Sequence, residues 1–146
     1  DGKNAVEQIA NDLKNHLGMK VKLRTMELGA ILKARNAGEI PALYWSWYAD
    51  YLDPQNFLSI LLASNASANY DKWSNSEFDK LCAAADLEAD PAKREALYLQ
   101  AESLLLDQVP RVPLYFGVDG LLVSPKVTGV RYNLLGSMPH NKVEFK

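Results

Sequence analysis

The segment 42–56 constrains the fold more than any other part of the chain. It begins like a β-strand, because four of the five residues from Leu43 to Trp47 are apolar or aromatic and have high β-propensity. It ends like the start of a helix, since Asp53 is a good N-cap and Pro54 suits the first helical position. Residues 48–52 therefore follow a predicted strand and precede a predicted helix. In open α/β sheets, ligands bind outside such carboxyl ends of strands.

This segment is dense in aromatic side chains and contains a carboxylate with no assigned structural role. Five aromatic residues fall within eight positions: Tyr44, Trp45, Trp47, Tyr48 and Tyr51. Asp50 stands among them. Core packing would account for Tyr44 and Trp45, and a turn would account for Asp50. Neither explains the density of aromatic residues, so the segment is a candidate ligand-binding site.

Helices and strands are predicted to alternate before this segment. Val6, Ile9 and Leu13 repeat on one face of a helix, which Gly18 ends. Residues 20–26 alternate between apolar or hydroxyl side chains and basic ones, as in a strand with one covered face. A short helix over residues 28–36 follows. With the strand at 43–47, this order indicates parallel βαβ units with right-handed crossovers.

The chain after the segment is predicted to be helical as far as Gln108. Helices are expected after Asp53-Pro54, from Ser76 as N-cap to about residue 87, and from Asp90-Pro91 to about residue 108. The buried stripe of the last helix is predicted at four positions: Leu97, Ala101, Leu104 and Leu105. The single cysteine, Cys82, shares an apolar helix face with Phe78 and is expected to be a buried small hydrophobe.

The C-terminal part of the chain reads as extended. Pro110 and Pro113 stiffen the segment between them. Short strands are predicted at residues 114–118 and 121–123, with a turn at Asp119-Gly120 between them, and at residues 142–145.

Composition excludes several classes of function. The 146 residues are 48% apolar and 23% charged, which is typical of a globular domain. The net charge is −2 and no run of five like charges occurs, so a nucleic-acid or anionic-membrane surface is not expected. No stretch approaches 18 consecutive apolar residues, so no membrane-spanning helix is expected.

Residues for catalysis or for metal binding are not grouped in the sequence. Asp50 and Asp53 form a carboxylate pair, but a capping role holds Asp53 ionised and unsuited to be a general acid. No His, Cys, Asp and Glu cluster has metal-ligand spacing, and the glycines form no phosphate-binding loop. We therefore expect no enzyme activity, no cofactor and no metal. A carboxylate beside aromatic rings suits a cationic amine, with a charge-assisted hydrogen bond of about 1.5–3 kcal/mol.

The order of motifs resembles one family of binding proteins. Residues 47–58, Trp-Tyr-Ala-Asp-Tyr-Leu-Asp-Pro-Gln-Asn-Phe-Leu, resemble the W-x-A-D-Y-x-D-P-x-x-F-L segment of family 5 extracellular solute-binding proteins. Asn69-Tyr70, residues 91–108, residues 110–115 and residues 122–129 resemble further motifs of the family, in the same order. These proteins serve bacterial ABC importers of oligopeptides and dipeptides, and the resemblance covers nearly the whole chain.

The resemblance implies an α/β fold, namely a partial lobe like that of periplasmic binding proteins, with a parallel or mixed sheet flanked by helices and a β-rich C-terminal return segment. Residues 1–108 would form part of the distal ligand-binding lobe, residues 109–113 the crossing between lobes, and residues 114–146 a segment of the other lobe. The chain would be the C-terminal part of a longer periplasmic or extracytoplasmic protein, anchored as a lipoprotein in some relatives, whose signal sequence it does not include. Its partners would be a small peptide and an ABC permease.

The resemblance also suggests roles for individual residues. Asp50 would hold the amino terminus of the peptide, and Trp47 would line a side-chain pocket. Ser46 and Tyr48 would offer main-chain groups to the peptide as an added strand, with Ala49 next to them. Arg35, in an R-x-x-G motif, and Tyr44 complete the candidate ligand-binding residues. Leu28 and Tyr44 replace a tryptophan and an arginine of some relatives, so no residue is assigned to a ligand carboxylate.

Two alternatives remain open on the sequence. The same fold could bind a nickel chelate or an oligosaccharide, and the retained Asp50 favours an amine over both. The aromatic strip could instead serve a free-standing protein-interaction domain. The apolar C-terminal strands, without an obvious cover in this chain, are further expected to self-associate or to be mobile.

Overall fold

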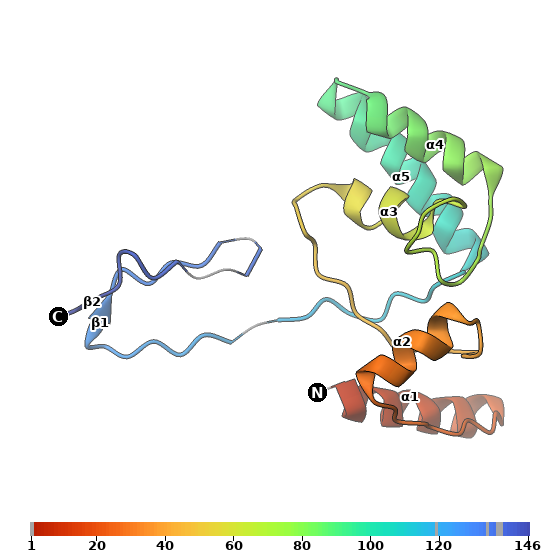
Figure 1. The fold of residues 1–146 in the computed structure, drawn as a ribbon, viewed down its shortest axis with the longest axis horizontal. Helices are drawn as coiled ribbons and strands as arrows, with labels where there is room; N and C mark the ends of the chain where they lie inside the picture. Colours follow the sequence, from red (N-terminus) through yellow and green to blue (C-terminus); the bar gives the residue numbers. More distant parts are fainter. Residues whose placement is uncertain (1, 119, 134, 137–138) are drawn as a thin grey trace. The chain divides into compact units, whose positions relative to one another are not determined.

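The computed structural model describes residues 2–118, 120–133, 135–136 and 139–146. Its elements, shown in Figure 1, are α1 (Gly2–Leu17), α2 (Leu28–Asn36), the 3-10 helix η1 (Pro54–Asn56), α3 (Ser59–Leu62), α4 (Ser76–Leu87), α5 (Pro91–Gln108), β1 (Val127–Thr128) and β2 (Glu144–Phe145). The chain divides into two compact units, residues 1–46 and residues 47–146, and each is described by itself. No helix in the described part is long and apolar enough to cross a membrane.

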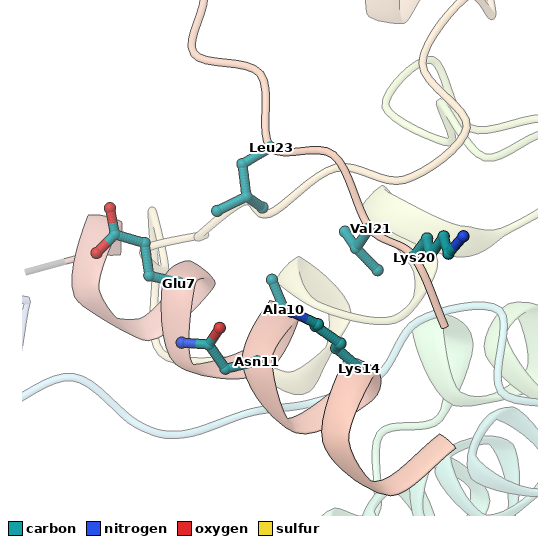
Figure 2. A pocket seen from close by; sticks show the side chains of 7 residues that line it. All are labelled: Glu7, Ala10, Asn11, Lys14, Lys20, Val21 and Leu23. Carbon is teal, nitrogen blue, oxygen red and sulfur yellow. The ribbon is translucent and has the colours of Figure 1, made fainter. Parts of the chain in front are cut away.

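The first unit is built from α1, α2 and the extended segments that follow them. The predicted apolar face of α1 is half-buried at Val6, Ile9 and Leu13. The segment that follows α1 lies along the helix, and Figure 2 shows Val21 and Leu23 pointing towards Ala10. The predicted alternation therefore agrees with the side-chain directions at residues 21 and 23. Both predicted helices of this unit are confirmed.

The two strands predicted in this unit are not found. Residues 20–26 and 43–47 are extended, but neither is hydrogen-bonded into a sheet with another described residue. A strand exists only when a neighbouring strand pairs with its N–H and C=O groups. The described part of this chain offers these segments no such neighbour, so the prediction of parallel βαβ units is corrected here: helices alternate with unpaired extended segments.

The core of the second unit lies between α4 and α5, which pack against each other, and α3 (Figure 1). Phe78, Cys82 and Ala85 of α4 are buried, as are Tyr98, Ala101 and Leu105 of α5 and Leu58, Leu61 and Leu62 at α3. The rings of Trp73 and Phe78 pack edge to face, with the ring centroids 4.9 Å apart. Burial of Cys82 is confirmed, and it raises the pKa of the thiol to about 11.

The stripe predicted for α5 is shifted by part of a turn. Ala101 and Leu105 are buried as expected, but Leu97 and Leu104 are only half-buried. Tyr98, which the pattern did not include, is buried instead. A buried tyrosine needs a hydrogen-bond partner for its hydroxyl group, and Tyr98 has one in Asp86.

The N-cap of α5 agrees with the prediction, whereas the N-cap of α4 differs from it by one residue. Asp90 caps α5 by accepting hydrogen bonds from the backbone N–H groups of Ala92 and Lys93. The cap of α4 is Asn75, whose Oδ1 accepts from the N–H groups of Glu77 and Phe78 at 2.9 and 3.0 Å. Ser76, the predicted cap, is the first residue of the helix. Asn75 takes the position because its extended backbone (φ −147°, ψ 114°) directs the side chain back at the first turn.

The described residues of the C-terminal region contain a short antiparallel ladder, in which Val127 pairs with Phe145 and Thr128 with Glu144. The predicted strand at 142–145 is therefore confirmed for its last residues. Gly129 is required beside the ladder, because its φ is +74° and a Cβ atom would lie 1.7 Å from the carbonyl oxygen of Lys142.

The strands predicted at residues 114–118 and 121–123 are not found among the described residues, and Asp119 of the predicted turn lies outside them. These segments are extended, but neither belongs to a sheet within the described residues, for the same reason as in the first unit. Their apolar side chains face solvent, and Phe116 and Leu122 are 98% and 99% exposed.

Candidate functional site

The turn at residues 53–56 supports the candidate site, and its predicted start is confirmed. The Asp53 side chain accepts a hydrogen bond from the N–H group of Gln55 at 2.9 Å, and Pro54 is the first residue of η1. The helix is a short 3-10 turn because Asn56 donates its N–H to the carbonyl of Asp53 at 3.1 Å, three residues back. This tight turn directs the Asn56 side chain back towards the residues that precede Asp53.

Asn56 brings two of the predicted site residues together. Its Oδ1 accepts a hydrogen bond from the indole Nε1 of Trp47 at 2.8 Å and another from the backbone N–H of Asp50 at 3.1 Å. Its Nδ2 donates to Oδ2 of the Asp50 carboxylate at 3.3 Å. Asn56 is 1% exposed, so these hydrogen bonds satisfy an amide that would otherwise be buried at a cost. Trp47 and Asp50 are thereby fixed on one support.

The candidate residues around this support are open to solvent. Tyr48 is 79% exposed and Trp47 is 38% exposed, Asp50 is exposed, and Ala49 is half-buried. Within the described residues, the second carboxylate oxygen of Asp50, Oδ1, has no hydrogen-bond partner. The site thus presents a carboxylate oxygen and a tryptophan ring on the same loop, which suits a ligand with a cationic group and an apolar part.

A second set of polar contacts ties the turn to the helical core. Nη2 of Arg94 on α5 donates to Oδ1 of Asp53 at 2.9 Å and to the hydroxyl of Tyr98 at 3.1 Å, and Nη1 donates to the carbonyl of Ala85. The Tyr98 hydroxyl donates to Asp86, which also accepts from Ser59 at 3.0 Å. This network joins the turn to both α4 and α5.

The network changes the pKa values of its members. Burial opposes ionisation of Asp53, but hydrogen bonds from Arg94 and from the Gln55 amide outweigh it and lower the pKa of Asp53 below its usual value. Burial, followed by the hydrogen bond to Asp86, raises the pKa of Tyr98. Asp53 is therefore an ionised capping and pairing residue, as the sequence indicated, and its pairing with Arg94 is an addition from the structure.

Three predicted residues, Arg35, Tyr44 and Ser46, lie in the first unit. The guanidinium carbon of Arg35 lies 5.1 Å from the centre of the Trp45 ring, and the Arg35 side chain contacts the amide oxygen of Asn36 at 3.4 Å. Tyr44 lies against the first turn of α1, where its ring carbon Cε1 would be 3.0 Å from a Cβ atom at Gly2. Tyr44 therefore packs on α1, as the core interpretation suggested, whereas Trp45 is 44% exposed, against that interpretation.

The backbone of Ser46 and Tyr48 bears on the predicted addition of a peptide strand. The two residues fall on either side of the boundary between the units, and the side chains of both are exposed. Neither residue forms a backbone hydrogen bond with another described residue. Their N–H and C=O groups are therefore available for pairing with an extended ligand.

Two other kinds of site were considered, a surface hollow and a metal site. A shallow hollow between α1 and residues 20–23 is lined by Glu7, Ala10, Asn11, Lys14, Lys20, Val21 and Leu23, none of which is a candidate site residue (Figure 2). Within the part of the chain that the structure describes, no group of His, Cys, Asp and Glu side chains could hold a metal ion.

Sequence reasoning missed Asn56 and Arg94. No local signal in the sequence indicated the role of Asn56, because its hydrogen-bond partners lie six and nine positions earlier. Arg94 is 41 positions from Asp53, and only the packing of α5 near the turn shows that they pair.

Comparisons with known proteins define the class. Residues 1–69 match the model of bacterial extracellular solute-binding proteins, family 5 Middle. The chain is 38% identical over 128 residues to the dipeptide-binding protein DppE of Bacillus subtilis (strain 168), covering 88% of this chain and 23% of the relative. It is 35% identical over 125 residues to the periplasmic murein peptide-binding protein MppA of Escherichia coli (strain K12), covering 86% of this chain and 23% of the relative.

Two further matches extend this result. The probable deoxycholate-binding periplasmic protein YgiS of Escherichia coli (strain K12) is 38% identical over 121 residues, covering 83% of this chain and 22% of the relative. The solved structure of the Escherichia coli murein tripeptide binding protein MppA superposes with a TM-score of 0.79 at 32% identity, covering 88% of this chain and 25% of that one.

These matches confirm the resemblance seen in the sequence, and the chain belongs to the family 5 extracellular solute-binding proteins. The chain spans about a quarter of the length of the relatives it matches. The solved relatives are α/β periplasmic binding proteins, which agrees with the predicted fold class at that level.

Proposed function

We propose that the chain contributes to the ligand site of an ABC-importer binding protein that captures peptides through their amino terminus and performs no chemistry on them. The observation that carries this proposal is the Asp50 carboxylate, supported by Asn56 on one oxygen and open to solvent on the other. An α-ammonium group would supply the missing donors, and an acidic side chain beside an aromatic ring favours such a cation. Trp47 would cover the first side chain of the peptide.

Main-chain pairing would supply the rest of the affinity. An extended peptide would pair with the N–H and C=O groups of Ser46 and Tyr48, next to Ala49, which have no backbone partner among the described residues. Such pairing recognises the backbone of a ligand rather than its side chains, so the site would accept peptides of different sequence. Arg35 and Tyr44 belong to the proposed site on the family resemblance alone.

The matched relatives support a peptide ligand. DppE and MppA are a dipeptide-binding and a murein peptide-binding protein, respectively. YgiS, a probable deoxycholate-binding protein, is equally similar. Deoxycholate carries a carboxylate and no amine, so the presence of Asp50 favours a peptide over a bile acid for this chain. The gene product would act in the periplasm or outside the cytoplasmic membrane, with a permease as its partner, and a lipid anchor is part of the same proposal.

The organisation into lobes is part of this proposal. Residues 1–108 would contribute to the distal lobe, residues 109–113 to the crossing, and residues 114–146 to a β-rich return segment of the other lobe. The exposed apolar segments at 114–118 and 121–123 would then be covered in the gene product and would drive self-association when these 146 residues stand alone.

The amine-binding role is tested by Asp50→Asn in the full-length gene product, with calorimetry of trialanine and N-acetyl-trialanine. The substitution keeps the shape of the side chain but removes the charge that an ammonium would pair with. We expect it to weaken trialanine binding by about 2 kcal/mol. The acetylated peptide should bind the wild type poorly and lose little more in the variant. Equal affinity of the wild type for both peptides would refute the role of Asp50.

A further inference from the structure

We infer that Asn56 is the positioning residue of the ligand site, because its single amide sets the direction of both the Asp50 carboxylate and the Trp47 indole. This inference rests on the proposed function for its meaning in ligand binding. Its geometric part can be tested without any ligand.

The hydrogen bonds leave the amide of Asn56 only one orientation. The indole N–H of Trp47 and the backbone N–H of Asp50 are both donors that cannot accept, and both lie on the same side of the amide, at 2.8 and 3.1 Å. The oxygen atom of Asn56 must therefore face them. The NH2 group is then left on the other side, where it meets Oδ2 of Asp50 at 3.3 Å.

Burial makes this orientation specific. Asn56 is 1% exposed, so water cannot replace a hydrogen bond that is lost when the amide rotates. The backbone of Asn56 is fixed as well, because its N–H donates to the carbonyl of Asp53 inside η1. The backbone hydrogen bond of Asn56 therefore fixes the position from which its side chain binds Asp50 and Trp47.

The consequence concerns the oxygen atom that the ligand would meet. Asn56 binds Oδ2 of the Asp50 carboxylate and leaves Oδ1 without a hydrogen-bond partner among the described residues. Without the NH2 donor, the carboxylate of an exposed aspartate would rotate among several orientations. A ligand would then have to order it on binding, which lowers affinity.

Two substitutions of Asn56 distinguish its hydrogen bond to the Asp50 carboxylate from those it accepts. Asn56→Asp keeps an oxygen that can accept from Trp47 and from the Asp50 N–H, but it places a second carboxylate against Oδ2 of Asp50. Asn56→Ala removes all three side-chain hydrogen bonds. Asn69→Asp is the matched control, because Asn69 is also an inward-facing loop amide of this unit, which donates to the carbonyls of Ala63 and Trp73 and does not contact Asp50.

The first measurement uses the ligand-free, full-length gene product with 15N-labelled tryptophan. The indole signal of Trp47, assigned through Trp47→Phe, should stay near its wild-type position in Asn56→Asp and should shift in Asn56→Ala. Hydrogen exchange at the Asp50 amide should likewise accelerate only in Asn56→Ala. An unchanged Trp47 signal and unchanged Asp50 exchange in Asn56→Ala would overturn the inference, whether or not any peptide binds.

The second measurement is the affinity for trialanine by calorimetry. We expect Asn56→Asp to weaken binding about tenfold or more while the Trp47 signal is retained, because only the carboxylate is displaced. Asn69→Asp should reduce thermal stability without a comparable loss of affinity. Wild-type affinity in Asn56→Asp would overturn the positioning role. Absence of trialanine binding to the wild type would instead refute the proposed function, and the ligand-free measurement would then decide the inference about Asn56.

Discussion

Asp53 has two separable functions in the turn, and a pair of substitutions measures each. Its Oδ1 caps η1 by accepting from the Gln55 N–H at 2.9 Å, and it also accepts from Nη2 of Arg94 at 2.9 Å. Asn is as good an N-cap as Asp, so Asp53→Asn keeps the cap and removes the charge. Asp53→Ala removes both the cap and the ion pair.

The expected costs follow from exposure. Loss of an N-cap costs about 1 kcal/mol of unfolding free energy. A hydrogen bond between charged groups contributes about 1.5–3 kcal/mol when desolvated. The side chains of Arg94 and Asp53 are 22% and 32% exposed, so solvent screening reduces the pair to about 1 kcal/mol. We therefore expect Asp53→Asn to cost about 1 kcal/mol and Asp53→Ala about 2 kcal/mol.

Urea unfolding of the 146-residue chain, followed by tryptophan fluorescence, measures both values. The double variant Asp53→Asn with Arg94→Gln tests the pairing, because its cost should be less than the sum of the two single costs. Equal costs for Asp53→Asn and Asp53→Ala would refute the capping part of the reasoning. A cost of zero for Asp53→Asn would refute the contribution of Arg94.

The ion pair between Asp53 and Arg94 makes the unfolding free energy depend on pH. The pKa of Asp53 is lower in the folded chain than its ordinary value of about 3.9 in an unfolded chain. The unfolded chain therefore takes up the proton first as the pH falls, and the contribution of the pair is full above about pH 3.9. It is lost as the pH falls through the lower folded pKa. The stability difference between wild type and Asp53→Asn should be constant from pH 7 to about pH 5 and should close below about pH 3.9.

Two further predictions concern the helix cap and the C-terminal region. Asn75→Ala should cost about 1 kcal/mol of unfolding free energy, because Asn75 caps α4, whereas Ser76→Ala should change it by no more than about 0.5 kcal/mol. Thermal unfolding that ranks the two variants in the opposite order would contradict the assigned cap. The isolated 146 residues should form dimers or larger species in light scattering, because Phe116 and Leu122 are almost fully exposed, and a strict monomer over a wide concentration range would argue against self-association.

The helices of this chain could be predicted because their signals are local. The start of α5 is encoded in Asp90-Pro91, and the face of α1 is encoded in the spacing of Val6, Ile9 and Leu13. The strands could not be placed in the same way. The alternation at residues 20–26 predicts which side chains face α1, but a strand also needs a partner strand, and sequence alone does not say whether the described chain supplies one.

The candidate site was predictable in its outline but not in its supports. Asp50 and Trp47 were identifiable as a carboxylate and an aromatic ring after a predicted strand. Asn56 would pass for an ordinary helix-start residue, because nothing local shows that its amide bonds to groups six and nine positions earlier. Arg94 would pass for a solvated residue of α5 for the same reason.

The turn at residues 53–56 is anchored in two directions, and this explains how an exposed loop can present a defined site. Asn56 binds Trp47 and Asp50 on the side of the proposed ligand site, while Asp53 binds Arg94 on the side of the helical core. Arg94 stands on an 18-residue helix that packs against α4, so the loop is tied to a rigid element. Loss of the Arg94 anchor would loosen the turn as a whole, which lowers stability and affinity together. Loss of the Asn56 amide would instead leave the turn attached and misdirect the carboxylate, so affinity would fall more than stability. The two anchors therefore make different contributions, because one fixes where the loop lies and the other fixes which atoms it presents.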